Sequence, residues 1–347
     1  MATYRYFLIG AVCVFGVIGA AGWIRQRSHR PKIAVQKPSQ PVVEEVSLAA
    51  PKPAAPSKPA PAAKPVAAKS KPVPKPAPKA EPAPAASDDL PDADRIDQLF
   101  ALDSSRLPIV ETLSYTSRVP WLEGRPAWIA DYATQFETSR HFIARSLNRK
   151  PDYFSQKVSP GDRFNVFRRD KKLQFHLLID VARCKMWFYC IDAGSNERIL
   201  LKTYRVGLGR QDSRKPSGSL TPLGKYELGD KIAIYKPGTM GTFQEQKTEM
   251  IRVFGTRWIP FQKEIEGCTE PAKALGIHGA PWLLDPVSGN LVEDSSKIGK
   301  YDSDGCIRLA QPDMEEIFSI IITKPTVVEL VKDFHEAKLP GIERNLP

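Results

Sequence analysis

Two short segments in the last third of the chain carry residue types that do nucleophilic chemistry. A histidine lies in the sequence IHG at 277–279, and a cysteine lies in SDGCIRL at 303–309. A cysteine attacks as its thiolate, and histidine is the usual base that removes the thiol proton. Taken singly, such a cysteine is more often a small buried apolar residue and such a histidine a structural one. Because a glycine stands beside each of them, we predict that Cys306 is a nucleophile and His278 its base.

The sequence offers no other common catalytic site. None of the five histidines forms a pair with the spacing of zinc ligands, and the cysteines at 184, 190, 268 and 306 contain no CxxC pair. The GxxxxGK(S/T) and GxGxxG motifs of nucleotide-binding proteins do not occur. We therefore expect neither a metal nor an organic cofactor.

The segments around the two residues resemble a known family. HG followed by S-x-G-C-(I/V)-R-(M/L) is similar to the signature of bacterial L,D-transpeptidases, the cysteine enzymes that cross-link peptidoglycan. The segment SLTPLGKY at 219–226 resembles the TPxGxY segment of that family, and LIDV at 178–181 with WFY at 187–189 resembles its first pair of strands. The resemblance covers about Leu173 to Val331. It implies a mainly β catalytic domain over 171–347, a β-sandwich of the L,D-transpeptidase type with one or two helices.

The resemblance also implies an activity in cell-wall biogenesis and cell shape. Cys306 would attack the carbonyl that follows the L-centre of the diamino acid in a peptidoglycan stem tetrapeptide, and the terminal D-Ala would leave. An amine of a neighbouring stem would then take the thioester, with His278 acting first as acid and then as base. Members of the family are acylated by carbapenem-type inhibitors, so we expect such compounds to modify Cys306.

Further residues of the motif receive roles by the same resemblance. Ser303 and Gly305 fix the turn before the nucleophile, and main-chain N–H groups near Gly305 and Cys306 are candidates for the oxyanion site. Gly279, beside the base, is together with Arg308, Gly305 and Ser303 a candidate for binding the substrate or the oxyanion. Arg308 either binds a substrate carboxylate or forms a salt bridge that supports the Cys306 strand. Thr221 and Pro222 are expected to shape the fold rather than to contact the substrate.

Two features depart from the family pattern. Asp304 stands where the family usually has histidine, which removes a polar group from beside the nucleophile. The segment between His278 and Cys306 is longer than usual, and Pro281 to Lys300 is expected to form an extended loop, either a lid over the acceptor side or a surface insertion without a role.

Two alternative functions stay open at this point. An L,D-carboxypeptidase would use the same residues with water as the acceptor, so that no cross-link forms. A non-catalytic peptidoglycan-binding envelope protein would have lost its activity, with Asp304 marking the decayed site.

The catalytic residues must be positioned by strands. We predict strands over 173–181, 185–191, 198–206, 224–228, 231–235, 250–254, 275–278, 305–309 and 326–331 from their β-branched and aromatic residues. One helix begins at Pro312, with acidic residues in its first turn where the helix dipole favours them.

A small α+β module is predicted over 90–170. Helical spacing of apolar residues occurs over 92–102, 127–136 and 139–147, and the turn SPGD at 159–162 leads into a strand at 163–167. The order from residue 127 onward is similar to the latter part of a lysin-motif glycan-binding module. No matching first strand is evident in the sequence.

The first 89 residues resemble a membrane anchor with a spacer. Residues 7–24 are uncharged and apolar, which predicts a transmembrane helix or a signal segment within 1–30, and we favour an uncleaved anchor. Residues 31–89 form a linker rich in Pro, Ala and Lys that cannot bury a core. More Lys and Arg follow the apolar run than precede it, which opposes export by the positive-inside rule. The chemistry of peptidoglycan nevertheless favours a catalytic domain on the periplasmic side.

The net charge of +11 does not indicate a nucleic-acid partner. The first 86 residues hold 13 Lys and Arg against three acids, so the remaining chain carries only about one positive charge. Recognition of phosphates needs clustered cations on a folded surface.

Overall fold

The computed structural model describes residues 90–148, 157–230 and 232–344. The predicted membrane segment at 1–30 and linker at 31–89 lie outside these residues. Within the described ranges, no helix is long and apolar enough to cross a membrane.

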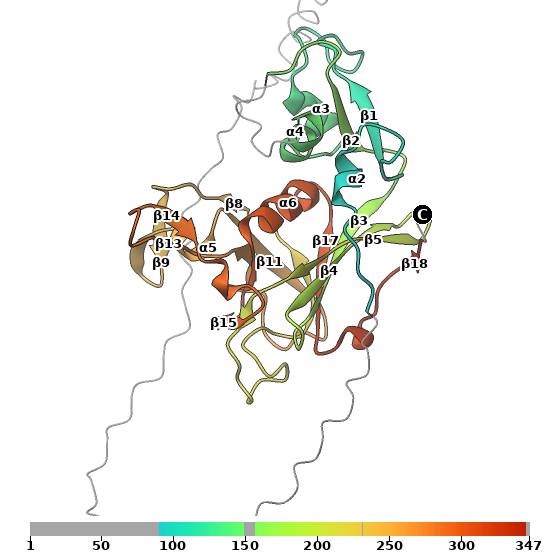
Figure 1. Ribbon diagram of the computed structural model, residues 1–347. Helices are drawn as coiled ribbons and strands as arrows, with labels where there is room; N and C mark the ends of the chain where they lie inside the picture. Colours follow the sequence, from blue (N-terminus) through green and yellow to red (C-terminus); the bar gives the residue numbers. More distant parts are fainter. Residues whose placement is uncertain (1–89, 149–156, 231, 345–347) are drawn as a thin grey trace, which may run out of the picture. The chain divides into compact units, whose positions relative to one another are not determined.

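The catalytic part is built on one large mixed sheet, as the predicted mainly β fold requires (Figure 1). Its strand order is β16-β12-β11-β7-β17-β3-β4-β5-β18, and β8 pairs with β11. The strands are β3 (Leu173–Asp180), β4 (Lys185–Asp192), β5 (Glu197–Arg205), β7 (Gly224–Leu228), β8 (Ala233–Ile234), β11 (Arg257–Glu266), β12 (Gly276–Gly279), β16 (Ile307–Leu309), β17 (Thr326–Val331) and β18 (Ile342–Glu343).

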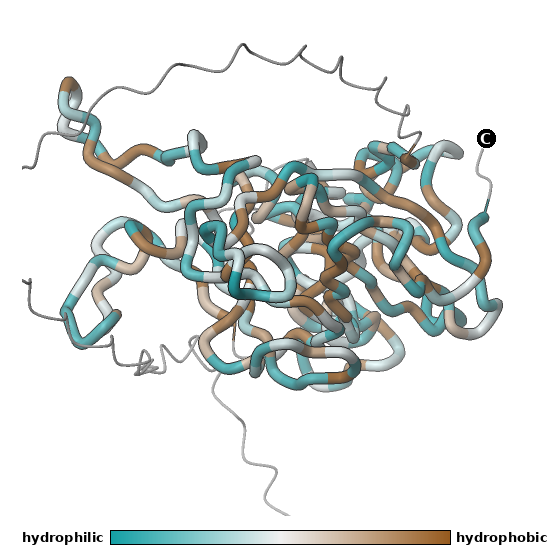
Figure 2. Tube along the Cα trace, turned by 90° about the horizontal axis from the view of Figure 1, so that it is seen from below, coloured by the Kyte–Doolittle hydropathy of each residue, from teal (hydrophilic) through white to brown (hydrophobic). Residues whose placement is uncertain are grey.

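The central strands are buried on both faces. Alternate residues of β4 enter different apolar clusters: Met186 and Phe188 face the main core, whereas Trp187 and Tyr189 face a second cluster. This explains why the sequence of these strands is almost continuously apolar instead of alternating with polar residues. In Figure 2 the strongly hydrophobic stretches accordingly concentrate in the middle of the trace.

One longer helix covers the main core next to the site. Helix α6 (Gln311–Ile321) carries a proline in its first turn, together with Asp313, as predicted. It buries Met314, Ile317 and Phe318. Helix α6 begins two residues after β16 ends and packs on β11 and on β12, the strand that carries His278.

The N-terminal part holds the three predicted helices, α2 (Ile96–Phe100), α3 (Ile129–Gln135) and α4 (Arg140–Asn148). The turn at 159–162 leads into β2 (Arg163–Phe167) as expected. Strand β2 pairs in an antiparallel manner with β1 (Val110–Ser114), which the sequence analysis did not identify. The sequence VETLS is short and half polar, so it gives little strand signal by itself. The lysin-motif resemblance stays a prediction.

The N-terminal part and the sheet share one apolar core. Phe142 of α4 contacts Phe167 at a ring distance of 4.6 Å, and Phe167 contacts Phe175 of β3 at 5.9 Å. Ser139 hydrogen-bonds to the carbonyl of Ser319 in α6. The domain boundary at 170/171 stays a prediction.

Two segments differ from their predicted conformation. Residues 250–254, predicted as a strand, contain the short helix α5 (Ile251–Phe254), which ends at Gly255 with φ +62°. The extended loop predicted over 281–300 instead contains the hairpin of β13 (Trp282–Leu284) and β14 (Leu291–Glu293) and the 3-10 turn η1 (Ser295–Lys297). Further short elements are β6 (Leu208–Gly209), β15 (Tyr301–Ser303), β9 (Met240–Phe243), β10 (Gln246–Glu249) and the 3-10 turn η2 (Phe334–Glu336).

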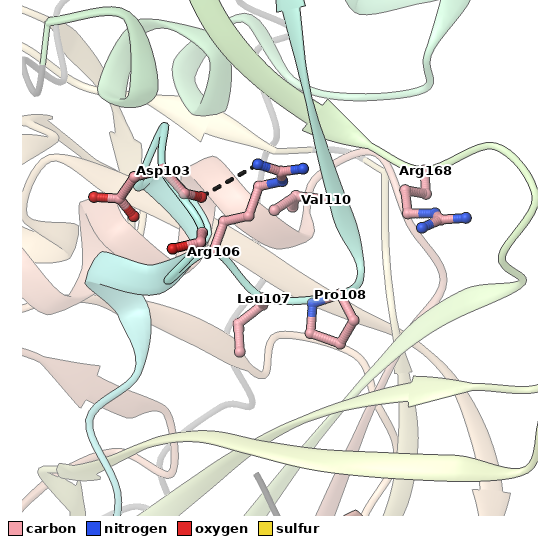
Figure 3. A pocket seen from close by; sticks show the side chains of 7 residues that line it. Asp103, Arg106, Leu107, Pro108, Val110 and Arg168 are labelled. Carbon is pink, nitrogen blue, oxygen red and sulfur yellow. Dashed lines mark hydrogen bonds between the residues drawn. The ribbon is translucent and has the colours of Figure 1, made fainter. Parts of the chain in front are cut away.

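A surface hollow of about 500 Å³ lies in the N-terminal part (Figure 3). Arg106, which donates to the carbonyl of Asp103 at 3.2 Å, and Arg168 stand at its sides, with Leu107, Pro108 and Val110 between them. None of the residues predicted to do chemistry lines this hollow. The candidate active site therefore lies elsewhere, around His278 and Cys306.

Candidate active site

The sheet brings His278 and Cys306 to two neighbouring strands. Strands β12 and β16 are parallel, with Ile277 opposite Ile307 and His278 opposite Arg308. Cys306 immediately precedes β16 and packs against Phe254 and Trp258, whose rings also contact His278. The two residues that the motif paired therefore share their aromatic neighbours.

A hydrogen-bonded turn fixes the position of the nucleophile. Ser303 is buried, and its hydroxyl donates to the carbonyl of Cys306 at 2.6 Å while accepting from the N–H of Gly305 at 3.1 Å. Gly305 has φ +119°, and a Cβ there would lie 2.9 Å from the carbonyl oxygen of Leu220. Ser303 and Gly305 thus occupy the places that a turn-forming role requires.

Thr221 of the TPxGxY-like segment ties this turn to β6, which pairs with β15. Its side chain is completely buried, and its hydroxyl accepts from the N–H of Gly209 at 2.7 Å and donates to the carbonyl of Gly305 at 3.1 Å. The hydroxyl therefore connects β6 to the residue before the nucleophile. This contact agrees with the expected role of Thr221 in shaping the fold.

Aromatic residues that the sequence analysis did not single out form a wall beside the pair. Phe254 meets the His278 ring edge to face at 5.3 Å, and Trp258 lies 5.7 Å from the same ring. Cys306 packs against the cluster that Met250, Phe254 and Trp258 form. The misassigned segment 250–254 thus supplies part of the site, and no local motif marks it.

A close main-chain approach allows this wall to reach His278. A Cβ on Gly255 would lie 2.6 Å from the carbonyl oxygen of Ala280 and 2.8 Å from Gly279. Only glycine fits there, since its φ of +62° is also unfavourable for other residues. Gly279, one of the predicted site residues, contributes its small size and its carbonyl group.

The hydrogen bond of His278 sets its tautomer. Its Nδ1 lies 2.7 Å from the carbonyl oxygen of Gly279. A carbonyl can only accept, so the neutral ring carries its proton on Nδ1 and offers Nε2 as the base. Burial, with the positive charge of Arg308 as a second cause, lowers the pKa of His278 to about 3. The ring is therefore neutral at physiological pH, as a proton acceptor must be.

The thiol of Cys306 is also neutral in the resting protein. Burial raises the pKa of Cys306 to about 11, although the N–H of Gly276 and the charge of Arg308 favour the thiolate. The thiol lies 3.7 Å from the carbonyl oxygen of Ala274. Among the described residues, no hydrogen bond joins the sulfur to the His278 ring. The resting site is therefore a thiol and an imidazole, not an ion pair.

Arg308 is engaged by the protein itself. Its guanidinium lies 2.8 Å from a carboxylate oxygen of Asp302, and only 16% of its side chain is exposed. Asp302 also binds Lys297 at 3.2 Å. Of the two roles considered for Arg308, the salt bridge that supports the Cys306 strand is the one the geometry contains.

Asp304 lies on the outside of the turn. Its carboxylate pairs with the guanidinium of Arg210, and the two side chains are 62% and 60% exposed. Asp304 therefore points away from the buried hydroxyl of Ser303 and toward solvent. Its negative charge is one of the causes that raise the pKa of Cys306.

The oxyanion candidates differ in their availability. The N–H of Gly305 already donates to Ser303, whereas the N–H of Cys306 has no acceptor among the described residues. Of the two N–H groups, that of Cys306 is therefore the available one, and the oxyanion site stays a prediction. In the described part of the chain, no cluster of three or more His, Cys, Asp or Glu side chains could hold a metal ion.

Two bacterial proteins of known structure are similar to part of this chain. The helical cell shape determining protein Pgp2 from Campylobacter jejuni is 17% identical, with a TM-score of 0.31, and the match covers 50% of this chain and 53% of that one. Bd1075 from Bdellovibrio bacteriovorus is 12% identical, with a TM-score of 0.31 and coverage of 46% and 48%. This chain thus spans about half the length of these proteins.

The family comparison concerns the part of the chain that holds the site. No curated protein sequence matches the chain. Residues 174–330 match the family model of the L,D-transpeptidase catalytic domain, YkuD, which includes His278, Cys306 and the segment around Thr221. The resemblance inferred from the motifs is thereby confirmed for residues 174–330, which match the catalytic domain of the L,D-transpeptidase family.

Proposed function

We propose that the chain is a peptidoglycan L,D-transpeptidase that works through a Cys306 thioester. The observation that carries the proposal is the pairing of β12 with β16. This pairing brings a neutral imidazole, whose Nδ1 donates to the carbonyl of Gly279, onto the strand beside the one that follows the partly exposed thiol of Cys306. The substrate is a stem tetrapeptide whose diamino acid is joined to a terminal D-Ala.

Each half of the reaction moves one proton through His278. In the first half, Nε2 takes the thiol proton while the sulfur bonds to the scissile carbonyl carbon. The bond to D-Ala then breaks, and His278 returns the proton to the leaving amine. In the second half, the acceptor amine gives a proton to His278 and bonds to the thioester carbon, after which the imidazolium reprotonates the departing sulfur.

The electrostatics of the site suit a thiolate that forms only with substrate in place. Because the thiol is neutral at rest, it is poorly reactive toward other electrophiles. Arg308 stabilises negative charge on the sulfur, and the free N–H of Cys306 can receive the oxyanion. The Phe254 and Trp258 wall keeps water from one side of the imidazole.

The place of action follows from the substrate. Peptidoglycan lies outside the cytoplasmic membrane, so the apolar segment at 7–24 anchors the chain and residues 31–89 span the distance to the wall. Added protease should cleave the chain in intact spheroplasts of a Gram-negative host. Protection of the catalytic domain until the membrane is broken would contradict this location.

The activity is tested with the full-length chain and a disaccharide tetrapeptide, with products identified by mass spectrometry. We expect release of D-Ala together with a cross-linked dimer, both lost in Cys306→Ala. A trimmed tripeptide without dimer would identify an L,D-carboxypeptidase and refute the transpeptidase. Equal products from Cys306→Ala and the parent would refute the thioester. A carbapenem adduct on Cys306, seen by intact mass, is the expected companion result.

A further inference from the structure

We infer that Arg210 binds the terminal carboxylate of the donor peptide, and that Asp304 occupies this position until the substrate replaces it. The inference rests on the proposed function and names a binding residue that the motif analysis did not include. It concerns the carboxylate of the D-Ala that leaves, which is one residue beyond the scissile carbonyl.

The main chain holds Arg210 against the turn that carries the nucleophile. The N–H of Arg210 donates to the carbonyl of Ser303 at 2.9 Å, and its carbonyl accepts from the N–H of Leu220 at 2.8 Å. The residue is therefore fixed from both sides. Its side chain begins beside the SDGC segment, so the guanidinium reaches Asp304, two residues before Cys306.

Arg210 is the accessible one of the two arginines that flank the turn. Its side chain is 60% exposed, whereas that of Arg308 is 16% exposed and paired with Asp302. Asp302 is in turn held by Lys297. A substrate carboxylate would have to displace Asp302, which Lys297 also holds, to reach the largely covered guanidinium of Arg308. At Arg210 it has to displace a single exposed carboxylate, and exposed ion pairs contribute little.

The geometry of the guanidinium leaves room for a second carboxylate. Arginine has five N–H donors in a planar fork that matches a carboxylate with two parallel hydrogen bonds. In the described part of the chain, Asp304 is the acceptor for one terminal nitrogen of Arg210. Asp304 thus holds the fork on the solvent side of the turn that carries the nucleophile, and the peptide carboxylate competes for it.

The exchange gives Asp304 a defined effect on affinity. With Asp304 in place, a donor peptide binds Arg210 only if its own terminal carboxylate displaces that of Asp304. A peptide with an amidated C-terminus therefore gains no affinity from Arg210. Without Asp304, the guanidinium is free and the acidic donor binds more tightly. Asp304, the residue that departs from the family pattern, therefore sets how strongly the site prefers donors with a free C-terminal carboxylate.

The first test measures positive charge at the nucleophile without requiring catalysis. Cys306 in the full-length chain is alkylated with anionic iodoacetate and with neutral iodoacetamide at one pH, and its modification is followed by mass spectrometry. Removing or adding one unit charge near the sulfur is expected to change the ratio of the two rates by up to about threefold in water. We expect Arg210→Ala to lower this ratio and Asp304→Asn to raise it. The exposed Arg118→Ala and Glu123→Gln variants change the net charge equally and serve as controls.

The second test uses the donor itself. For a tetrapeptide with a free C-terminal carboxylate, Arg210→Ala should raise KM about two- to fivefold with little change in kcat, because the lost ion pair is exposed. Arg210→Lys should restore part of the loss, and Asp304→Asn should lower KM. The C-terminally amidated peptide should show the same KM with Arg210→Ala as with the parent.

The outcomes separate this inference from the proposed function. If Arg210→Ala raises KM equally for the free-acid and the amidated peptide, Arg210 only supports the turn. That result would overturn the inference. Alkylation ratios that do not differ from those of the controls would overturn it as well. A parent protein without activity, but with the expected shifts in alkylation ratio, would support an anion site at Arg210 and refute the proposed function.

Discussion

Replacing Thr221 by valine tests how the turn before Cys306 is held. The two side chains have nearly the same shape, but valine lacks the hydroxyl that joins the N–H of Gly209 to the carbonyl of Gly305. Thr221 is completely buried, so water cannot replace the lost partner in the variant. The change therefore removes two hydrogen bonds and leaves one buried donor and one buried acceptor without partners.

The expected cost follows from these contacts. A typical hydrogen bond contributes about 1 kcal/mol net, and a buried group left unsatisfied costs about 1–3 kcal/mol. We expect Thr221→Val to lower the free energy of unfolding by about 2–4 kcal/mol. That is a large fraction of the roughly 5–15 kcal/mol that stabilises a typical protein.

Urea unfolding followed by tryptophan fluorescence measures the loss, and Thr221→Ser is the matched control. Serine keeps the hydroxyl and removes only one buried methyl group, which costs about 1 kcal/mol. The reasoning requires Thr221→Val to be clearly less stable than Thr221→Ser. If the two variants lose equal stability, or if valine costs less than about 0.5 kcal/mol, the hydroxyl does not hold the turn.

The same substitution should affect the chemistry at temperatures where the variant is folded. Gly305 is the residue before the nucleophile, and loss of its carbonyl contact loosens the position of the Cys306 N–H and sulfur. We expect kcat to fall by at least about tenfold while KM changes less, because positioning errors reduce the reaction rate more than substrate affinity. An unchanged kcat in a folded Thr221→Val protein would show that Thr221 matters for stability alone.

Three further outcomes follow from the geometry and electrostatics of the site. Gly305→Ala should cost about 1–3 kcal/mol of unfolding free energy, because φ is +119° and the new Cβ would lie 2.9 Å from the carbonyl oxygen of Leu220. Gly218→Ala, at φ +76° in open space, is the control that should cost less. The ring of His278 should stay neutral and protonated on Nδ1 down to at least pH 5 in ¹⁵N NMR spectra, since its pKa is lowered to about 3. A midpoint near pH 6.5 would contradict this. The rate of Cys306 alkylation by iodoacetamide should still rise between pH 9 and 10, because burial raises its pKa to about 11 and the thiolate fraction grows until then. A plateau at pH 9 would refute the neutral thiol.

The parts of the fold that could be predicted are those whose signal is local. Strands β7 and β17 have the predicted bounds, β3 and β4 differ by one residue at one end, and β5 differs by one residue at both ends, because apolar runs between clear turn residues define them. Strand β11 carries polar residues over most of its second half and was not predicted. Strand β1 is likewise half polar and was not predicted. Both exist because neighbouring strands supply their hydrogen bonds, which a sequence window does not contain.

The candidate pair was predictable for a related reason. His278 and Cys306 stand in short motifs, and the glycines beside them restrict the local conformation in ways that a sequence records. Phe254 stands in no such motif. It contacts His278 only because α5 ends at Gly255 and because Gly255 and Gly279 both lack a Cβ where the two chains meet.

Charge partners were the least predictable part of the site, because pairing depends on which loops meet. The sequence shows Asp304 as the loss of a histidine and Arg308 as a conspicuous cation beside the nucleophile. In the structure Arg308 is committed to Asp302, and the cation that faces solvent comes from Arg210, 94 residues away from Asp304 in the chain. Asp304, which in the motif alone suggests a site that has lost its activity, is thus one half of an ion pair. Whether that pair selects acidic donors or merely braces the turn is decided by the KM of the amidated peptide.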